Sequence, residues 1–329
     1  MTRLRLNGAL ALAGATAILA GLMAGSAPLS LADTLAGLAG TGPEGARLIV
    51  QEIRLPRVLA AFLTGAALGA SGALLQGLLR NPLADPGVLG VSAMAALGAV
   101  IAIWFGLAAI SAFAVPLMAI AFAALAAALL AGLAAARLSV VQLILAGVGV
   151  SSFAGALSAL AMNLAPTPFT LSDLVNWLLG SVANRSFTDL ALAAPFWIAG
   201  AGLAALALPG LRALTLGEDT ALSLGADVPR ARLLAILASA LLTGAAVAVA
   251  GMIGFVGIVA PHLVRPLVRH DPGDLVLPSA LAAGAILALA DLAIRLAPFT
   301  QELKLGVAAA LIGAPAFIWI AARSASIGR

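Results

Sequence analysis

The charged side chains that could do chemistry in this sequence are few and stand beside long apolar runs. The stretch EIRLPR places Arg54 and Arg57 directly before an uncharged run, and LADLAIR places Asp291 four residues before Arg295. A guanidinium binds a carboxylate through paired, charge-assisted hydrogen bonds, and an aspartate one helical turn away can orient it. These arginines could therefore bind acidic groups, or they could extend to lipid phosphates.

Asp291 leaves a second possibility open, because a carboxylate inside a membrane-spanning segment is a candidate proton carrier. Proton relays usually chain several ionisable groups, and no other predicted span carries one at mid-depth. We therefore expect Asp291 to pair with Arg295, or with a neighbouring helix, and to orient the arginine.

The sequence lacks the motifs of nucleotide hydrolysis and thiolate metal binding. A P-loop needs GxxxxGK followed by Ser or Thr, and the sole lysine, Lys304, lies in ELKLG, so the chain has no ATP site of its own. Cysteine is absent, which excludes disulfides and thiolate metal sites. His262, in APHLVR, could ligate haem, but a capping or interface role is simpler, and His270 is expected in a solvated loop. No set of Ser, His and Asp suggests a hydrolase.

Composition places these residues in a membrane protein. Of 329 residues, 63% are hydrophobic and 9% are charged, and the mean hydropathy is +1.15. A spanning helix needs about 20 mostly apolar residues. We predict an all-α polytopic membrane protein, one transmembrane domain over residues 1–329, with ten spans at 8–29, 56–79, 88–107, 112–135, 140–164, 190–209, 231–250, 254–268, 275–295 and 305–322. The first span could instead be a secretory signal, since Arg3 and Arg5 precede it.

The distribution of positive charge predicts the orientation. With a cytoplasmic amino terminus, eleven basic residues fall inside and six outside, which together make the 17 of the sequence. This bias favours two cytoplasmic termini, although six outside is many. The charges are scattered between apolar runs, so there is no patch to grip nucleic acid.

Two polar connections are predicted to carry structure of their own. The stretch PTPFTLSDLVNWLLG, with Ser172 and Asp173 as candidate N-caps, predicts a short helix over about 171–181 on the outer surface. The stretch at 213–229, ALTLGEDTALSLGADVP, predicts two short cytoplasmic helices joined at Gly225. A structured inner loop of this kind suggests docking on a soluble partner.

Glycines recur at helical spacing in two of the predicted spans. One set is Gly65, Gly69 and Gly72, and the other is Gly147, Gly149 and Gly155. Small residues let helix backbones approach each other in lipid. Tight packing is therefore the simpler interpretation, and a substrate path between helices is the lesser one.

Six stretches, in order from residue 51 to residue 320, together resemble the permease subunits of type II ATP-binding-cassette importers for cobalamin, haem and iron siderophores. They are IRLPRVLAAFLTGAALGASGALLQGLLRNPLADPGVLGVS, LILAGVG, LGEDTALSLGADVPRAR, AGMIGFVGIVAPHLVR, LADLAIR and LIGAPAFIW. The resemblance implies ten spans per subunit, in agreement with the spans counted above, and two subunits around a central path.

The resemblance also implies roles for individual residues. Binding-protein docking falls on Arg54, Arg57 and Arg295, which match arginines that receive glutamates from the two lobes of a periplasmic binding protein. We expect these three arginines to be exposed cations. The cytoplasmic gate falls on Asn81, Leu83, Ser139 and Val140, and ATPase coupling falls on Glu218, Ala221, Leu224 and Gly225. Val140 stands where the cobalamin permease has a small polar residue, which suggests a more apolar gate. Asn81 and Ser139 could equally be helix caps.

We therefore expect a permease subunit of an ATP-driven importer in the bacterial inner membrane. Its partners would be a second copy of itself, two ATPase subunits that hold ATP and Mg²⁺, a periplasmic binding protein and the lipid bilayer. The chain itself would bind no cofactor. The wording DPGVLG looks more like that of haem and cobalamin permeases than that of siderophore permeases, and we expect haem as the cargo, with a siderophore or cobalamin as alternatives. A proton-coupled secondary transporter and an intramembrane enzyme are the competing classes.

Overall fold

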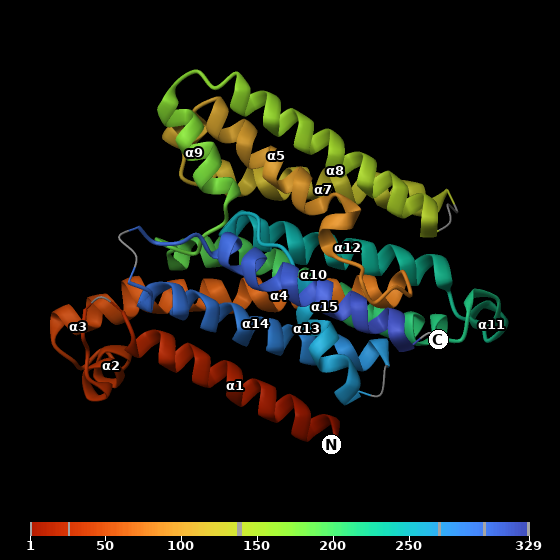
Figure 1. Cartoon of the computed structure of the whole chain (residues 1–329), viewed down its shortest axis with the longest axis horizontal. Helices are drawn as coiled ribbons and strands as arrows, with labels where there is room; N and C mark the ends of the chain where they lie inside the picture. Colours follow the sequence, from red (N-terminus) through yellow and green to blue (C-terminus); the bar gives the residue numbers. More distant parts are fainter. Residues whose placement is uncertain (1, 26, 137–139, 269–270, 299–300, 328–329) are drawn as a thin grey trace.

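The computed structural model describes residues 2–25, 27–136, 140–268, 271–298 and 301–327, and every regular element within these ranges is a helix (Figure 1). Seven helical stretches are long and apolar enough to cross a membrane, and three further apolar helices are shorter. The long stretches are α1 (Arg3–Met23), the helix that ends in α4 (Leu55–Leu78), α7 (Ala114–Ala135), α8 (Val140–Asn163), α10 (Phe187–Leu214), α12 (Val228–Ala250) and α14 (Pro272–Leu296). The shorter helices are α5 (Val91–Trp104), α13 (Val256–Val264) with the turn η3 (Arg265–Val268), and α15 (Leu305–Ile327). Each of the ten predicted spans therefore has its helix.

The second span begins earlier than predicted. α3 (Glu44–Leu48), the π-helical turn η1 (Ile49–Arg54) and α4 form one continuous helix, whereas the sequence pattern placed its start at residue 56. Pro56 lacks a backbone N–H, so a helix tolerates it only where the hydrogen-bond pattern is interrupted. The wider turn η1 supplies that interruption, and the helix continues outward beyond the proline.

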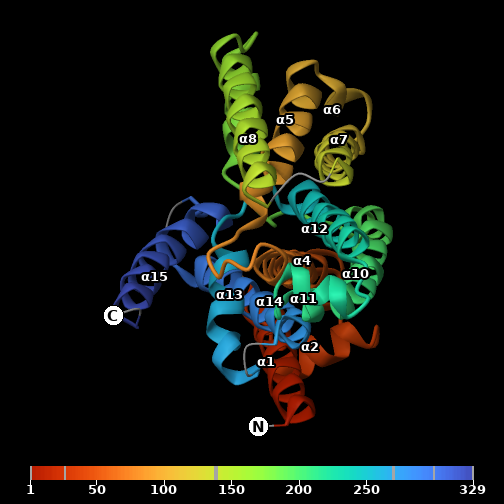
Figure 2. The same cartoon turned by 90° about the vertical axis from the view of Figure 1, so that its right-hand side faces the viewer.

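α4 is the central helix of the bundle, with α14, α12, α13 and α1 packed around it (Figure 2). Glycines permit this close approach. A methyl group added at Gly72 would overlap the carbonyl oxygen of Gly257, and one at Gly65 would overlap that of Ala283. These close approaches confirm the prediction that the glycines allow tight packing. In lipid, dispersion contacts between closely packed backbones hold helices together in place of the hydrophobic effect.

A second group of helices, α5, α7 and α8, lies beside α12 (Figure 1). On α8, a methyl group at Gly147 would overlap the carbonyl oxygen of Val88, but Gly149 and Gly155 have no described atom within 4 Å. The packing prediction is therefore wrong for those two glycines. α8 also exposes Phe153, so much of the surface of this helix is open to lipid or to another chain.

The two ends of the bundle differ in structure. α2 (Leu31–Leu38) and α3 lie at one end, and α11 (Glu218–Ser223) lies at the other, together with the start of α1 and the end of α15 (Figure 1). α1 packs along α14 and does not stand apart from the bundle. This packing favours a membrane span at the amino terminus over a secretory signal.

The short helix after α8 is present but is displaced from its predicted position. α9 (Pro168–Leu178) begins after the N-cap Thr167, whose hydroxyl accepts a hydrogen bond from the Thr170 amide at 3.1 Å. The predicted caps Ser172 and Asp173 are wrong, because both residues lie inside the helix. Proline at the first helical position fixes the earlier start, since its missing N–H is not needed there.

Candidate functional site

The three arginines expected to bind a partner come together at the end of the bundle that carries α2 and α3. Arg54 closes η1, Arg57 lies in the first turn of α4, and Arg295 lies in the last turn of α14. Arg54 is buried, with 4% of its surface exposed, and its Nη1 donates hydrogen bonds to the carbonyl oxygens of Leu22 (2.8 Å) and Met23 (2.9 Å). Its charge is therefore directed at the end of α1.

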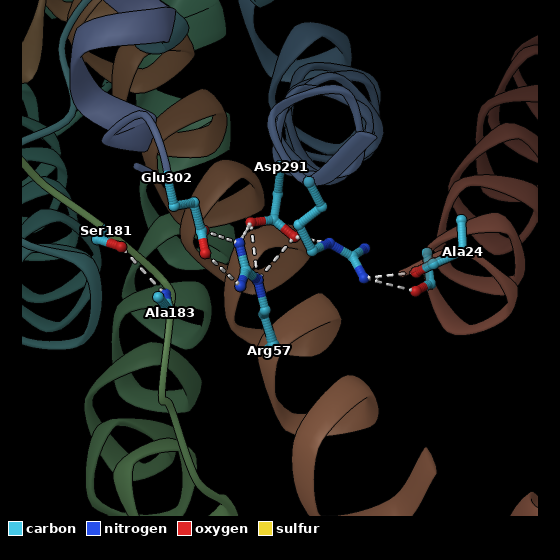
Figure 3. A network of polar contacts seen from close by, with 8 residues as sticks. Ala24, Arg57, Ser181, Ala183, Asp291 and Glu302 are labelled. Atoms are coloured by element: carbon cyan, nitrogen blue, oxygen red, sulfur yellow. Dashed lines mark hydrogen bonds and ion pairs between the residues drawn. The ribbon is translucent and has the colours of Figure 1, made fainter. Parts of the chain in front are cut away.

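Arg295 acts on the same helix end. Its Nη1 donates to the carbonyl oxygens of Gly21 (3.0 Å) and Ala24 (2.9 Å), as Figure 3 shows for Ala24. The last carbonyls of a helix have no partner within it and carry the negative end of its dipole. Two arginines from neighbouring helices thus cap α1, which fastens it to α4 and α14.

Asp291 forms ion pairs with both Arg57, as Figure 3 shows, and Arg295. Its Oδ1 accepts from Arg57 Nη2 at 2.8 Å and from Nε at 3.0 Å, and its Oδ2 lies 3.0 Å from Arg295 Nε. The expected pairing of Asp291 with Arg295 is confirmed, and the pairing with Arg57 across two helices adds to it. Arg57 also forms an ion pair with Glu302, in the segment between α14 and α15.

The guanidinium groups of these arginines are already paired within the chain. The side chains of Arg57 and Arg295 are 13% and 8% exposed, so the expectation of exposed arginines waiting for acidic groups is wrong. The reason is that cations beside apolar helices need internal partners. The three arginines nevertheless line a cavity of about 370 Å³ at this end of the bundle, together with Glu302, and their docking role remains a prediction.

The turn expected to form the cytoplasmic gate follows α4. Asn81 Oδ1 accepts a hydrogen bond from the Leu83 amide at 2.9 Å, so the side chain closes a tight turn and does not cap a helix. Asn81 is exposed, and Leu83 is half-buried. Of the other two gate candidates, Val140 is the first residue of α8, and Ser139 lies outside the described residues.

A buried polar side chain, that of Gln76, holds this turn in place. Gln76 donates from Nε2 to the Ala84 carbonyl oxygen at 3.3 Å, and Arg265 donates to the Gln76 side-chain oxygen. Farther along the turn, Asp85 accepts a hydrogen bond from the Gly87 amide at 2.7 Å. Burial raises the pKa of the Asp85 carboxyl, and this hydrogen bond offsets part of the rise. The turn expected to form the gate is therefore held against α4, α13 and η3.

The coupling segment at the opposite end contains one short helix and not the predicted two. α11 is followed by Gly225, whose φ of +80° lies in the left-handed region that favours glycine, and the next turn already belongs to α12. Leu224 is 67% exposed, whereas Ala221 is buried against the bundle. Glu218 forms an ion pair with Arg232 at 2.6 Å. Of these predicted coupling residues, Leu224 therefore presents an exposed apolar side chain and Ala221 does not, and their coupling role remains a prediction.

Comparison with known proteins identifies the family. The model of the FecCD transport family matches residues 12–323. The chain belongs to this family. It is 40% identical over 286 residues to the uncharacterized ABC transporter permease protein YvrB of Bacillus subtilis strain 168, with 85% of this chain and 80% of that protein covered. It is 37% identical to the vitamin B12 import system permease protein BtuC of Salmonella paratyphi A, with 84% and 85% covered.

The fold of the FecCD chain is also similar to that of a solved inward-facing structure of a transporter described as being of the metal-chelate ABC type. The TM-score is 0.84 at 31% identity, and the match covers 97% of this chain and 99% of the other. The chain is therefore an all-α permease subunit of an ATP-binding-cassette importer, as the sequence predicted. Permeases of this family do not hydrolyse ATP themselves.

Three residues of the FecCD sites could not be found by reading the sequence. Glu302 joins the arginine cavity, and Gln76 and Arg265 support the gate turn. Helical spacing could relate Asp291 to Arg295, which share one helix, but no spacing rule relates residues on different helices. The only available signal was that Gln76 is a polar residue within an apolar span, which is by itself a reason to look for a partner.

His262 lies on α13 of the permease and is half-buried. Its Nδ1 has no hydrogen-bond partner among the described residues, and those residues contain no group of three His, Cys, Asp or Glu side chains that could hold a metal ion. The capping or interface role expected for it stays a prediction. His270 lies outside the described residues.

Proposed function

We propose that this FecCD permease is the membrane subunit of an importer that moves a metal chelate across the bacterial inner membrane. As a single transmembrane domain it would form a homodimer, with two ATPase subunits on the cytoplasmic side and an extracytoplasmic binding protein on the other. Both termini are then cytoplasmic, and the ATPase subunits hold ATP and Mg²⁺.

The observation that carries the proposal is the difference between the two ends of one bundle. A cavity lined by arginines lies at one end, where cations suit acidic groups of a binding protein, and α11 with its exposed Leu224 lies at the other. Arginine on the outer side opposes the usual charge bias of membrane proteins. Complementary charges orient and speed docking more than they tighten it, which suits repeated delivery.

Transport by such an assembly needs two states of the path and no tight cargo site. The turn around Leu83 and the start of α8 at Val140 would close the cytoplasmic end, and apolar side chains there would exclude water and ions. ATP binding by the partner subunits would bias the bundle between outward and inward states through α11. A tight site would hold the cargo at the middle of the membrane.

Haem is the cargo we propose. The DPGVLG stretch in the inner turn resembles haem and cobalamin permeases more than siderophore permeases, and the vitamin B12 permeases at 37% identity support cobalamin as the second candidate. Haem and cobalamin are both metal-bearing macrocycles, in line with a similar transporter described as being of the metal-chelate type. A ferric siderophore is the third cargo of the same class.

Reconstitution tests this function. The permease is placed in lipid nanodiscs with its ATPase subunits, and ATP hydrolysis is measured with binding proteins loaded with haem, cobalamin or a ferric siderophore. We expect the haem-loaded protein to stimulate hydrolysis most. Stimulation by cobalamin alone would reassign the cargo, and stimulation by none of the three would refute the importer.

The same preparation tests the coupling end. Leu224→Asp is expected to lower cargo-stimulated hydrolysis about tenfold, because a charge would enter an apolar contact with the ATPase. Leu31→Asp is the matched control, since Leu31 is an exposed leucine on α2 at the opposite end. Equal loss in both variants, or unchanged hydrolysis in Leu224→Asp, would remove α11 from the coupling.

A further inference from the structure

The cavity lined by Arg54, Arg57 and Arg295, which we name the outer cavity, already contains a carboxylate of the chain itself. Glu302 lines it, pairs with Arg57 through both carboxylate oxygens, and lies in the short segment that leads from α14 to α15 (Figure 3). The cavity holds about 370 Å³, which is ample for a second acidic side chain.

The two acids of this network differ in how firmly they are held. Asp291 lies within α14, its side chain is 2% exposed, and it is shared by two arginines. The side chain of Glu302 is 43% exposed and its recorded partner among the described residues is Arg57. An exposed ion pair contributes little net free energy, whereas a buried one is costly to break. Glu302 is therefore the acid that can be exchanged.

The outer cavity also has more cations than acids around it. Three cations face two acids here, so the cavity keeps a net positive charge while Glu302 is in place.

We propose that Glu302 is an internal stand-in for a partner's acidic side chain, and that docking exchanges one carboxylate for the other on Arg57. This inference rests on the docking function proposed above and names the residue that regulates it. Exchange keeps the guanidinium paired before and after docking, so no unpaired cation is created in either state. Competition from Glu302 also weakens the binding of any partner that has no acidic side chain able to reach Arg57, and this increases specificity.

The exchange has a structural consequence, because Glu302 lies three residues before α15. The Gly306 amide donates to the Gly180 carbonyl oxygen at 3.2 Å, and a methyl group at Gly306 would overlap the carbonyl oxygens of Leu179 and Met252. The first turn of α15 is thus wedged between the end of α9 and the segment after α12. Releasing Glu302 removes the ion pair that ties the segment before this turn to α4.

The experiment measures binding of the extracytoplasmic binding protein to the complete permease and ATPase complex in nanodiscs. Glu302→Gln keeps the shape of the side chain and removes its charge. We expect the Kd to fall about two- to fivefold, since an exposed competing ion pair is removed. Glu52→Gln is the matched control, because Glu52 is an exposed acid of η1 at the same end that has no recorded partner among the described residues.

A second measurement reports on the segment itself. Lys304 is the sole lysine of the chain, so the rate at which an amine-reactive ester acylates it can be followed by mass spectrometry. Glu302→Gln is expected to raise that rate about twofold or more in the isolated complex, because the segment is no longer tied to Arg57. Glu52→Gln should leave the rate unchanged.

The outcomes separate this inference from the function on which it rests. Tighter binding in Glu302→Gln alone, with faster acylation of Lys304, supports the exchange. An unchanged or higher Kd in Glu302→Gln, or an equal fall in both variants, overturns it while the docking function stands. Absence of any binding by the unaltered complex overturns the docking function and the exchange together.

Discussion

Individual residues in this permease show how cations persist in an apolar bundle. Arg54 and Arg295 donate to the last carbonyl oxygens of α1, and Asp291 is shared by Arg57 and Arg295. Each guanidinium therefore neutralises either a helix end or a carboxylate, which offsets the free-energy cost of burial. The same arrangement brings three cations close enough together to line one cavity.

Asp291→Asn is expected to destabilise the protein. The change leaves two neighbouring guanidiniums without their shared carboxylate, and breaking a buried ion pair costs about 3–5 kcal/mol. Thermal unfolding of the purified permease in detergent measures the effect as a lower Tm. Glu52→Gln, which removes an exposed acid, should change stability by about 0.5 kcal/mol or less.

The same variant separates an importer driven by ATP from a proton-coupled transporter. If Asp291 carried protons, Asp291→Asn would abolish uptake while the fold stayed as stable as the unaltered protein, and removal of the ATPase subunits would not matter. Its place between two arginines argues against this, because Arg57 and Arg295 both use its carboxylate as their ion-pair partner. We expect unstable protein and uptake that depends on the ATPase subunits.

The elements are positioned by small residues on the central helix. Gly65, Gly69 and Gly72 lie on the side of α4 where α14 and α13 cross it, and their missing side chains set the distance between backbones. At Gly72 the opposing atoms belong to the backbone of Gly257 at the start of α13. Backbone cannot move aside as a side chain can, so this crossing tolerates no added volume.

Gly72→Ala is therefore expected to cost about 3 kcal/mol of stability, the upper range for overpacking a tight core. Gly202→Ala on α10 is the control, because no described atom lies within 4 Å of a methyl group there. That variant should be neutral or slightly stabilising, since alanine favours helix more than glycine does. A Gly72→Ala protein with an unchanged Tm would show that α13 is free to move away from α4.

The whole molecule has two unlike ends, and this polarity carries the proposed function. α2, α3 and the outer cavity lie at one end, while α11 and the helix ends next to both termini lie at the other (Figure 1). An even number of crossings follows from this arrangement. The charge bias of the sequence then favours the α11 end as the cytoplasmic one.

Labelling of intact cells tests the orientation, and the natural lack of cysteine makes single-cysteine variants straightforward. Thr41→Cys, in the exposed turn between α2 and α3, should react with a membrane-impermeant maleimide added outside. Thr220→Cys, on the exposed surface of α11, should react only after the cells are opened. The reverse labelling pattern would show that the α11 end faces the outside, and would remove the basis for placing the ATPase at α11.

The amino-acid sequence was enough to predict the class of this protein. Long apolar runs require helices, because lipid offers no hydrogen-bond partners to an open backbone, and each of the ten predicted runs has its helix among the described residues. Spacing within one helix also predicted the pairing of Asp291 with Arg295, which are four residues apart. Local rules of this kind depend only on neighbouring positions in the chain.

The tertiary structure alone decided which residues meet across helices. Glu302 reaches Arg57, Arg265 reaches Gln76, and the end of α1 takes its caps from two other helices. Such contacts depend on how helices pack and rotate, and polar hydrogen bonds between residues far apart in sequence leave no periodic pattern. For the same reason the exposure expected for the arginines was wrong, since burial belongs to the assembled bundle and not to a stretch of sequence.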